Sequence, residues 1–358
     1  MLTRLTMAIA YFRKMQLRIR PYSLQFKHPF GVSSNTRRET PTVFVCLQEG
    51  EHKGYGEACL PAYLGETTGD TLAFLEKAGT LLQHTNTSVS LDALLDELDQ
   101  LSIANNAGKA ALDIALHDLY AKVKGQSFAE FMGIKAAMPV ATSFTIGIDN
   151  AEKTREKIEE AAEFSILKIK AGTANDRALI ELIRSLTNKP LYVDVNQGWS
   201  NTTEAIALAQ WMSQQGVLLL EQPMPVNNKD QMRLLSAKSP IPTMADESVK
   251  RLQDIPLMDG MFKGVNIKLM KSGGLREAMR MISACRKKNL FVMLGCMAES
   301  SCATTAMAQL MGMADFVDLD APSLYTNDPF GGATYHQGKI KLPTGIGIGA
   351  FPLPQFDF

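Results

Sequence analysis

The sequence has no excess of charge of either sign. It contains 37 Lys and Arg residues against 37 Asp and Glu residues, so its formal net charge is zero, and no basic tract stands out along the chain. Nucleic acids and other polyanions are bound through clusters of positive charge. The even balance therefore favours a small-molecule substrate and predicts no nucleic-acid partner.

Cysteine is scarce and odd in number. Five cysteines occur in the chain, and none of them forms a C-x-x-C pair. An odd number in a chain of this length argues against a disulfide framework. We therefore expect free thiols and a reducing, cytoplasmic location.

Long apolar runs are absent as well. The opening segment, MLTRLTMAIAYFRKM, has only a short apolar stretch between basic residues. This stretch is too short to span a bilayer, and no small-residue cleavage site follows it. We expect neither a membrane segment nor a secretion signal, and we interpret Met15 as a candidate start of the folded part.

What the chain does contain begins with a mixed region, residues 1–135. Residues 17–26 and 42–47 have the alternation and β-branching of strands, whereas residues 70–84, 91–101 and 106–123 have helical spacing. Polar, glycine-containing stretches near 28–40 and 58–70 indicate two loops. The pattern predicts an N-terminal α+β domain that carries two exposed loops.

Residues 136–322 follow a different rhythm. Eight short apolar strands alternate with amphipathic helices about every 25 residues, as βα units require. Eight such units predict a TIM-type barrel, with the last helix reduced or missing. A doubly wound sheet would need a glycine-rich phosphate turn after its first strand, and the only similar run, GIGIG at 345–349, is not followed by a helix. Residues 323–358 are predicted to return and pack on the N-terminal domain.

Charged residues stand at the carboxyl ends of six of these eight strands. The set comprises Lys168, Lys170, Asp194, Glu221, Asp246, Lys268, Asp318 and Asp320. One such residue alone is usually a helix cap or a solvated turn residue. However, inward positions of a barrel are normally apolar, and burying an unpaired charge is costly. Eight charges at one level therefore require one another or a ligand, and the carboxyl ends of the strands are where TIM barrels hold their active sites.

The acids on the third, fourth and fifth strands indicate a metal site. Asp194, Glu221 and Asp246 would offer only carboxylate oxygens, which suits Mg²⁺, with Mn²⁺ as the alternative. Zinc would prefer His or Cys. None of the five histidines lies on a predicted strand end, so a zinc site is disfavoured.

The lysines indicate proton transfer. Lys168 and Lys170 share one face of their strand, and Lys268 lies four strands further round the barrel. Two bases on opposite faces of one carbon suggest racemisation or epimerisation, because one removes the proton and the other returns it. A lysine near Mg²⁺ and another cation is expected to have a lowered pKa. The metal would stabilise the ene-diolate that forms when an α-proton leaves beside a carboxylate.

Five motifs in this order resemble the muconate lactonizing enzyme subgroup of the enolase superfamily. They are K-I-K at 168–170, D-V-N-Q-G-W at 194–199, E-Q-P at 221–223, A-D-E-S at 245–248 and N-I-K-L-M-K-S-G-G at 266–274. The resemblance covers nearly the whole chain and implies an α/β fold, a modified (β/α)7β TIM barrel under an N-terminal α+β capping domain with two lid loops. By analogy it also implies a homo-oligomer.

The resemblance assigns roles as well. It implies that Asp194, Glu221 and Asp246 bind the metal, with Glu247 and Asn196 near its shell. Lys170 and Lys268 would be the two acid/base catalysts, and Lys168 would help to hold the substrate carboxylate.

The segment D-L-D-A-P at 318–322 is similar to the D-x-D signature of dipeptide epimerases. Asp318 and Asp320 would face the same way and accept the free ammonium group of a dipeptide, whereas a muconate or N-acyl substrate would leave both carboxylates unpaired. By the same resemblance, Thr145, Cys296 and Ala298 should line the dipeptide pocket. Cys296 would be a contact and not a nucleophile, and Glu299 is interpreted as structural.

These features together predict an isomerase. The expected activity is a Mg²⁺-dependent dipeptide epimerase that inverts the α-carbon of the C-terminal residue of an Ala-Glu-like dipeptide from peptidoglycan peptide recycling. The alternatives in the same subgroup are an N-acylamino acid racemase, a cycloisomerase and an o-succinylbenzoate synthase. A catalytically silent binding protein is the alternative from another class.

One position departs from the family pattern. Members that act on Ala-Glu typically carry an arginine in the first lid loop, where this chain has Asn35. Arg37 and Arg38 follow closely, and either is a candidate to receive the glutamate side chain. A shift of preference to another side chain is the alternative.

Overall fold

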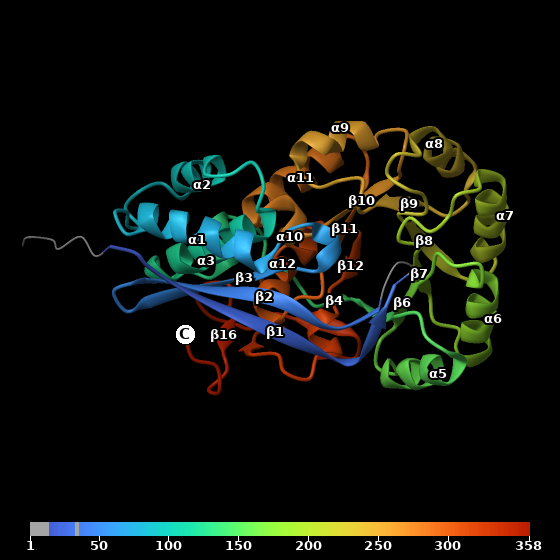
Figure 1. Cartoon of the computed structure of the whole chain (residues 1–358), viewed down its shortest axis with the longest axis horizontal. Helices are drawn as coiled ribbons and strands as arrows, with labels where there is room; N and C mark the ends of the chain where they lie inside the picture. Colours follow the sequence, from blue (N-terminus) through green and yellow to red (C-terminus); the bar gives the residue numbers. More distant parts are fainter. Residues whose placement is uncertain (1–13, 33–35) are drawn as a thin grey trace, which may run out of the picture.

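The computed structural model describes residues 14–32 and 36–358. Its N-terminal part is an antiparallel sheet of three strands, β1 (Gln16–Gly31), β2 (Thr36–Glu49) and β3 (His52–Cys59). A 3-10 helix, η1 (Ala62–Leu64), and four α-helices follow: α1 (Thr68–Leu82), α2 (Leu91–Gln100), α3 (Asn106–Val123) and α4 (Phe128–Met132). The predicted helices and the α+β character of this part are confirmed (Figure 1).

The first predicted loop is mostly a hairpin. β1 continues to Gly31 and β2 begins at Thr36, with Phe30 paired to Arg37 after a register shift that begins at Gln25. The prediction of a loop over 28–40 was therefore wrong for most of its length, because the ladder between the two strands resumes beyond the irregularity. Asn35 lies outside the described residues.

Helix α3 lies unusually close to strand β3. A Cβ atom on Gly56 would be 1.9 Å from the carbonyl oxygen of Ala111, and one on Gly54 would be 2.0 Å from that of Ala115. Glycines on the strand and alanines on the helix thus permit a contact that larger residues would block. The alanines at these positions of α3 serve this packing.

The second part is a barrel of eight strands in consecutive parallel order. The strands are β5 (Ser143–Ile146), β6 (Ile166–Lys170), β7 (Leu191–Asp194), β8 (Val217–Glu221), β9 (Thr243–Ala245), β10 (Gly264–Ile267), β11 (Phe291–Gly295) and β12 (Phe316–Asp318). The intervening helices are α5 (Ala151–Glu160), α6 (Asp176–Leu186), α7 (Thr202–Ser213), α8 (Lys229–Lys238), η2 (Leu252–Asp254), α9 (Ile255–Met258), α10 (Leu269–Ser272), α11 (Leu275–Lys287), α12 (Ser301–Ala308) and η3 (Met311–Met313). They form a ring outside the strands (Figure 1). After β12 only the short helix η4 (Ala321–Leu324) occurs before the tail, so the predicted barrel with a reduced last helix is confirmed.

The barrel has a seam between its first and last strands. Ladder hydrogen bonds join each strand from β5 to β12 to its neighbour, and across the described residues none is recorded between β12 and β5 themselves. Side chains bridge this gap, and one such bridge is the hydrogen bond from the Leu319 backbone N–H to Thr142 Oγ1, at 2.8 Å. The seam is therefore closed by specific polar side chains.

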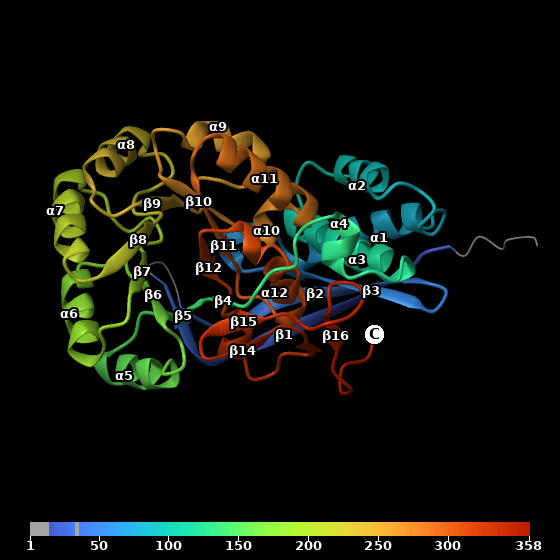
Figure 2. The same ribbon diagram turned by 180° about the vertical axis from the view of Figure 1, so that it is seen from behind.

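The C-terminal tail returns to the N-terminal sheet. Strand β13 (Phe330–Gly331) pairs with β16 (Phe351–Pro352), while β14 (Thr334–His336) and β15 (Lys339–Lys341) extend to β4 (Val140–Ala141) beside the barrel. The ring of Phe356 packs edge-on against Tyr22 of β1, with centroids 5.6 Å apart. Figure 2 shows this return from behind. Phe356 of the tail thus packs on the N-terminal sheet, whereas the domain limits 1–135, 136–322 and 323–358 stay predictions.

Two buried carboxylates of the N-terminal part lie at the starts of barrel helices. Glu57 of β3 accepts hydrogen bonds from the backbone N–H groups of Ser300 and Ala303 at the start of α12. Asp113 of α3 accepts one from the N–H of Leu275, the first residue of α11, at 2.6 Å. These groups would otherwise lack partners, so the contacts fix the N-terminal part on the barrel.

Of the described helices, none has the length and apolarity needed to cross a membrane. All five cysteines are free, as expected, and buried.

Candidate active site

Three acidic side chains meet at the carboxyl ends of neighbouring barrel strands. Asp194 ends β7, Glu221 ends β8 and Asp246 follows β9, and they offer carboxylate oxygens that all lie within 4.8 Å of one another. All three are buried. Carboxylates this close require positive charge between or beside them. The all-oxygen donor set fits Mg²⁺ or Mn²⁺ and not zinc, as the sequence predicts.

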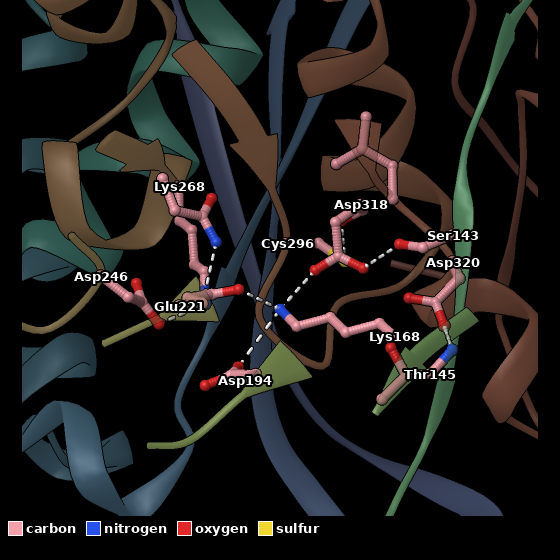
Figure 3. A network of polar contacts seen from close by, with 12 residues as sticks. Ser143, Thr145, Lys168, Asp194, Glu221, Asp246, Lys268, Cys296, Asp318 and Asp320 are labelled. Carbon is pink, nitrogen blue, oxygen red and sulfur yellow. Dashed lines mark hydrogen bonds and ion pairs between the residues drawn. The ribbon is translucent and has the colours of Figure 1, made fainter. Parts of the chain in front are cut away.

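Lysines surround this cluster. Lys168 Nζ lies 2.7 Å from Glu221 Oε2, 3.3 Å from Asp194 Oδ2 and 2.6 Å from Asp318 Oδ2. Figure 3 shows its ammonium between these three carboxylates. Lys170 Nζ lies 2.7 Å from Asp194 Oδ2, and Lys268 Nζ lies 2.7 Å from Asp246 Oδ2. Each acid of the cluster therefore contacts at least one cation supplied by the chain.

The pKa of Lys268 depends on burial and on its acidic neighbours. Burial would lower it, but the neighbouring carboxylates of Asp246 and Glu221 outweigh burial and raise it well above its ordinary range. The lowered pKa expected for a lysine beside bound Mg²⁺ stays a prediction for the metal-loaded site.

Burial also opposes ionisation of the acids. It would raise the pKa of Asp246, yet Lys268 and Lys271 lower that pKa well below its usual range. For Glu221, burial and the charge of Asp194 prevail and raise the pKa. The pKa of Asp246 is thus lowered while that of Glu221 is raised. Strongly shifted pKa values of this kind are frequent at functional sites.

Lys271 is a functional-site residue that the sequence reasoning missed. It lies on α10, and its ammonium donates to Asp246 Oδ1 and to the backbone oxygens of Asp246 and Asn266. The only signal was its place three residues after Lys268 in the K-L-M-K segment, a spacing that puts two side chains on one helix face. It holds one carboxylate oxygen of Asp246 while Lys268 holds the other.

Glu247 and Asn196 lie beside the cluster, as predicted. Asn196 Nδ2 donates to Glu247 Oε1 at 3.4 Å, and the backbone N–H of Asn196 donates to Asp194 Oδ1 at 3.1 Å. Burial and the charge of Asp246 raise the pKa of Glu247 to about 7. Glu247 and Asn196 therefore lie next to the three acids, and the backbone of Asn196 hydrogen-bonds to one of them.

Asp318 and Asp320 lie across the barrel seam from β5. Ser143 Oγ donates to Asp318 Oδ1 at 2.6 Å, and the backbone N–H of Thr145 donates to Asp320 Oδ2 at 2.6 Å (Figure 3). Burial and the charge of Asp318 raise the pKa of Asp320 to about 7. Ser143 was not among the sequence candidates, because nothing in its local sequence indicates a buried partner 175 residues away.

A cavity of about 370 Å³ opens above these residues. All the sequence-predicted pocket residues line it, namely Thr145, Lys168, Cys296, Ala298, Asp318 and Asp320, together with Lys170, Asp246 and Lys268. Strands β6 and β10, which carry Lys170 and Lys268, are four places apart in the eight-stranded order. The two lysines therefore reach the cavity from opposite sides.

The surroundings of the Cys296 thiol and the Glu299 carboxyl raise the pKa of both groups. Burial raises the pKa of Cys296 well above its ordinary value, and nearby Asp320 adds to the effect, which is the opposite of an activated thiol. Glu299 is buried and accepts a hydrogen bond from the Met297 backbone N–H. Burial and the charge of Glu57 raise its pKa to about 8.

Arg37 is the lid arginine that reaches the cavity. Its guanidinium lies over the rings of Phe26, Phe30 and Tyr63, at 5.5, 5.8 and 5.9 Å from their centroids. Among the described residues no carboxylate forms an ion pair with it, and it lines the same cavity as the lysines. Arg38, the other candidate, is exposed and is not part of the lining.

Family models match both parts of the chain. Residues 14–133 match the mandelate racemase / muconate lactonizing enzyme N-terminal domain, and residues 150–354 match the enolase C-terminal domain-like family. A curated relative, the L-Ala-D/L-Glu epimerase of Bacteroides thetaiotaomicron, is 41% identical over 341 residues, which cover 95% of this chain and 88% of that protein.

Solved structures share the fold. A dipeptide epimerase from Enterococcus faecalis, complexed with Mg and the dipeptide L-Leu-L-Tyr, superposes with a TM-score of 0.88 at 28% identity, covering 94% of this chain and 99% of that one. An N-succinyl Arg/Lys racemase from Bacillus cereus also gives 0.88, at 25% identity, with 95% and 96% of the two chains covered. The fold alone thus accompanies more than one substrate class.

Proposed function

Because this chain belongs to the mandelate racemase / muconate lactonizing enzyme family of the enolase superfamily and is an isomerase of the epimerase type, we propose that it is a Mg²⁺-dependent dipeptide epimerase. The proposed reaction inverts the α-carbon of the C-terminal residue by moving its proton from one face to the other. The observation that carries the dipeptide assignment is the pair Asp318 and Asp320 at the cavity wall.

The two acid/base roles fall to Lys170 and Lys268. They enter the cavity from strands on opposite sides of the barrel, so a carbon held between them presents one face to each. One amine removes the α-proton and the other ammonium returns a proton to the opposite face, which inverts the centre. The lysine that accepts a proton must be neutral, and release of its carboxylate partner would favour that state.

Asp194, Glu221 and Asp246 would hold Mg²⁺. When bound, the ion would supply positive charge for the negative charge that develops on the substrate carboxylate as the α-proton leaves. Lys168 would orient the same carboxylate, since its ammonium lies 2.7 Å from Glu221 Oε2 and faces the cavity. Lys271 would keep Asp246 in place from the side away from the substrate.

Asp318 and Asp320 suit a substrate with a free ammonium group. They are buried, and their carboxylates face the cavity near the cluster of acids and lysines. An N-acyl substrate has no ammonium group to place beside the Asp318 and Asp320 carboxylates, so its binding would cover these two acids without adding a positive charge, which is unfavourable. This is the argument against the N-acylamino acid racemase, cycloisomerase and o-succinylbenzoate synthase alternatives.

Arg37 supports an acidic side chain on the epimerised residue. The guanidinium is already stacked on three aromatic rings at the lid and has no ion-pair partner in the described parts of the chain. A glutamate side chain would supply the missing charge. Dipeptides of the Ala-Glu type, such as those released when cell-wall peptides are recycled, are the proposed substrates.

The test is α-proton exchange in D₂O, followed by NMR across a dipeptide library with Mg²⁺. We expect the fastest exchange with Ala-Glu and at least tenfold slower exchange with Ala-Gln, which has the same shape without the charge. Exchange with N-succinyl amino acids and with no dipeptide would contradict the proposal. If the protein binds Ala-Glu but exchanges no proton, the result would support the alternative of a catalytically silent binding protein.

Asp318→Asn and Asp320→Asn separate the substrate classes. Each should lower kcat/KM for Ala-Glu by about 100-fold or more, because a charge-assisted contact to the ammonium is lost. Both residues also bridge the barrel seam, so circular dichroism and thermal unfolding of each variant are required. A folded Asp318→Asn enzyme with unchanged activity would contradict the proposed role.

A further inference from the structure

The seam between β5 and β12 contains a repeated polar contact. Ser143 and Thr145 are two residues apart on the first barrel strand, and Asp318 and Asp320 are two residues apart at the last one. Each pair of opposite residues is joined by a 2.6 Å hydrogen bond, from Ser143 Oγ to Asp318 Oδ1 and from the Thr145 N–H to Asp320 Oδ2. Figure 3 shows both bonds side by side.

The two aspartates are held differently. Both oxygens of Asp318 are engaged, one by Ser143 and the other by Lys168 at 2.6 Å. Asp320 is held by Thr145, through its backbone N–H and its side chain. The partners of Asp320 thus come from one residue of β5, whereas Asp318 is shared between Ser143 and Lys168.

Lys168 is a shared partner. Its ammonium also contacts Glu221 and Asp194, and under the proposed function it turns to the substrate carboxylate. Asp318 would then lose one of its two contacts at the moment when the substrate binds. The Ser143 hydroxyl, which is fully buried, is the contact that would remain.

We propose that Ser143 is a positioning residue for ammonium recognition, which keeps the Asp318 carboxylate in place across the barrel seam. This inference rests on the proposed dipeptide epimerase function. The hydroxyl does not touch the substrate; it acts through Asp318. Without it, Asp318 can rotate away from the ammonium.

The structure supplies a matched control in the residue directly before β5. Thr142 Oγ1 also bridges the seam, by accepting from the Leu319 N–H at 2.8 Å, but it does not contact either aspartate. Thr142→Val keeps the side-chain shape and removes this bridge, together with the 3.3 Å hydrogen bond that Thr142 Oγ1 donates to the Ser143 carbonyl. Ser143→Ala and Thr142→Val therefore separate the positioning of Asp318 from simple closure of the seam.

The experiment compares steady-state kinetics of the Mg²⁺-loaded enzymes with L-Ala-L-Glu. Ser143→Ala should raise KM about tenfold, since a hydrogen bond to a charged group is lost, while kcat stays within about threefold. The preference for L-Ala-L-Glu over its N-acetyl derivative as a competitive ligand should fall by a similar factor. Thr142→Val should leave KM and this preference within about twofold of wild type. Ser143→Thr, which keeps the hydroxyl, should restore much of the affinity that Ser143→Ala loses.

The outcomes are distinguishable. Wild-type enzyme that turns over no dipeptide overturns the proposed function and, with it, this inference. Wild-type turnover with an unchanged KM in Ser143→Ala, or with equal changes in Ser143→Ala and Thr142→Val, overturns the role of Ser143 alone. If Ser143→Ala does not fold, Ser143→Cys, similar in size and a weaker donor, must raise KM in the same direction, and an unchanged KM in it also overturns the role.

Discussion

Lys170 and Lys268 face one cavity from opposite sides, so each should serve one epimer of the substrate. Replacing either by alanine should slow epimerisation by about 100-fold or more, the usual contribution of a positioned acid or base. Each variant should still exchange the α-proton of one epimer in D₂O, and the surviving epimer should differ between the two. NMR of L-Ala-L-Glu and L-Ala-D-Glu in D₂O measures this directly.

The control for these lysine variants lies at the opposite end of β10 from Lys268. Lys263 precedes β10 at the other end of the barrel and is exposed. Lys263→Ala should leave the exchange of both epimers within about twofold of wild type. Loss of both exchanges in each active-site variant would argue against one lysine per face.

At the residue scale, the sequence predicted the acids and lysines because charge at the inward end of a barrel strand is exceptional. Ser143 and Lys271 could not be predicted in the same way. Buried serines are ordinary in barrels, and the role of Ser143 follows from a partner brought near by closure of the seam. Arg37 was preferred over Arg38 only once the pairing of Phe30 with Arg37 fixed which side chain faces the cavity.

Among the elements, the contact of α3 with β3 should be intolerant of any added atom. A methyl group on Gly56 would meet the backbone of Ala111 at 1.9 Å, and backbone cannot move aside as a flexible side chain can. We expect Gly56→Ala to lower the free energy of unfolding by about 2 kcal/mol or more. Chemical denaturation of the purified protein measures it.

Helix α1 offers the matched control. A Cβ atom on Gly69, in its first turn, would meet nothing closer than 3.8 Å. Gly69→Ala should therefore be neutral or stabilising by up to about 1 kcal/mol, from helix propensity. A destabilisation equal to that of Gly56→Ala would show that glycine flexibility, and not close packing, matters at both places.

The contact between β3 and α12 should make stability depend on pH. Burial raises the pKa of Glu57 to about 7, against an ordinary value of 4.5. Between these values the folded protein keeps a proton that the unfolded chain has released, so this contribution favours folding at low pH and is lost as the pH rises through 7.

Glu57→Gln removes this titration and should flatten the curve. Between about pH 5 and about pH 8, wild type should lose more stability than the variant, by on the order of 3 kcal/mol at most. Urea denaturation at several pH values measures the difference. Glu181→Gln, an exposed site on α6, should follow the wild-type curve, and identical slopes in wild type and Glu57→Gln would refute the assignment.

At the element scale, the helices were predicted closely because apolar spacing is a local property. The hairpin at 28–40 was not, since its polar residues resemble a loop and its pairing depends on the facing strand. The contacts of Asp113 and Glu57 with the starts of α11 and α12 could not be predicted either, because the residues that meet are far apart in the sequence.

For the whole molecule, one hydrophobic core extends from the N-terminal sheet and helices into the barrel. Glu57 and Asp113 join the same two parts through helix starts, and the tail closes over the sheet. The cavity lies where these parts meet, with Arg37 and Tyr63 from the N-terminal part and the lysines from the barrel. Under the proposed function, contact of Arg37 with the substrate side chain and proton transfer by the barrel lysines would both depend on this fixed docking.

The charge balance of the site predicts how the molecule responds to metal removal. Each of Asp194, Glu221 and Asp246 already contacts a lysine of the chain, so we expect the protein to fold without the ion. EDTA should abolish turnover yet leave the circular dichroism spectrum unchanged. Adding Mg²⁺ back should restore activity and raise Tm, because a ligand held by the folded state alone stabilises it, by about 2.7 kcal/mol at 100 times Kd. Asp246→Asn should fold but show a smaller rise in Tm, whereas Asp149→Asn, whose carboxylate pairs with Lys157 and is not one of the three clustered acids, should show the full rise. Unfolding by EDTA would mean that the lysines do not balance the acids and that the metal is structural.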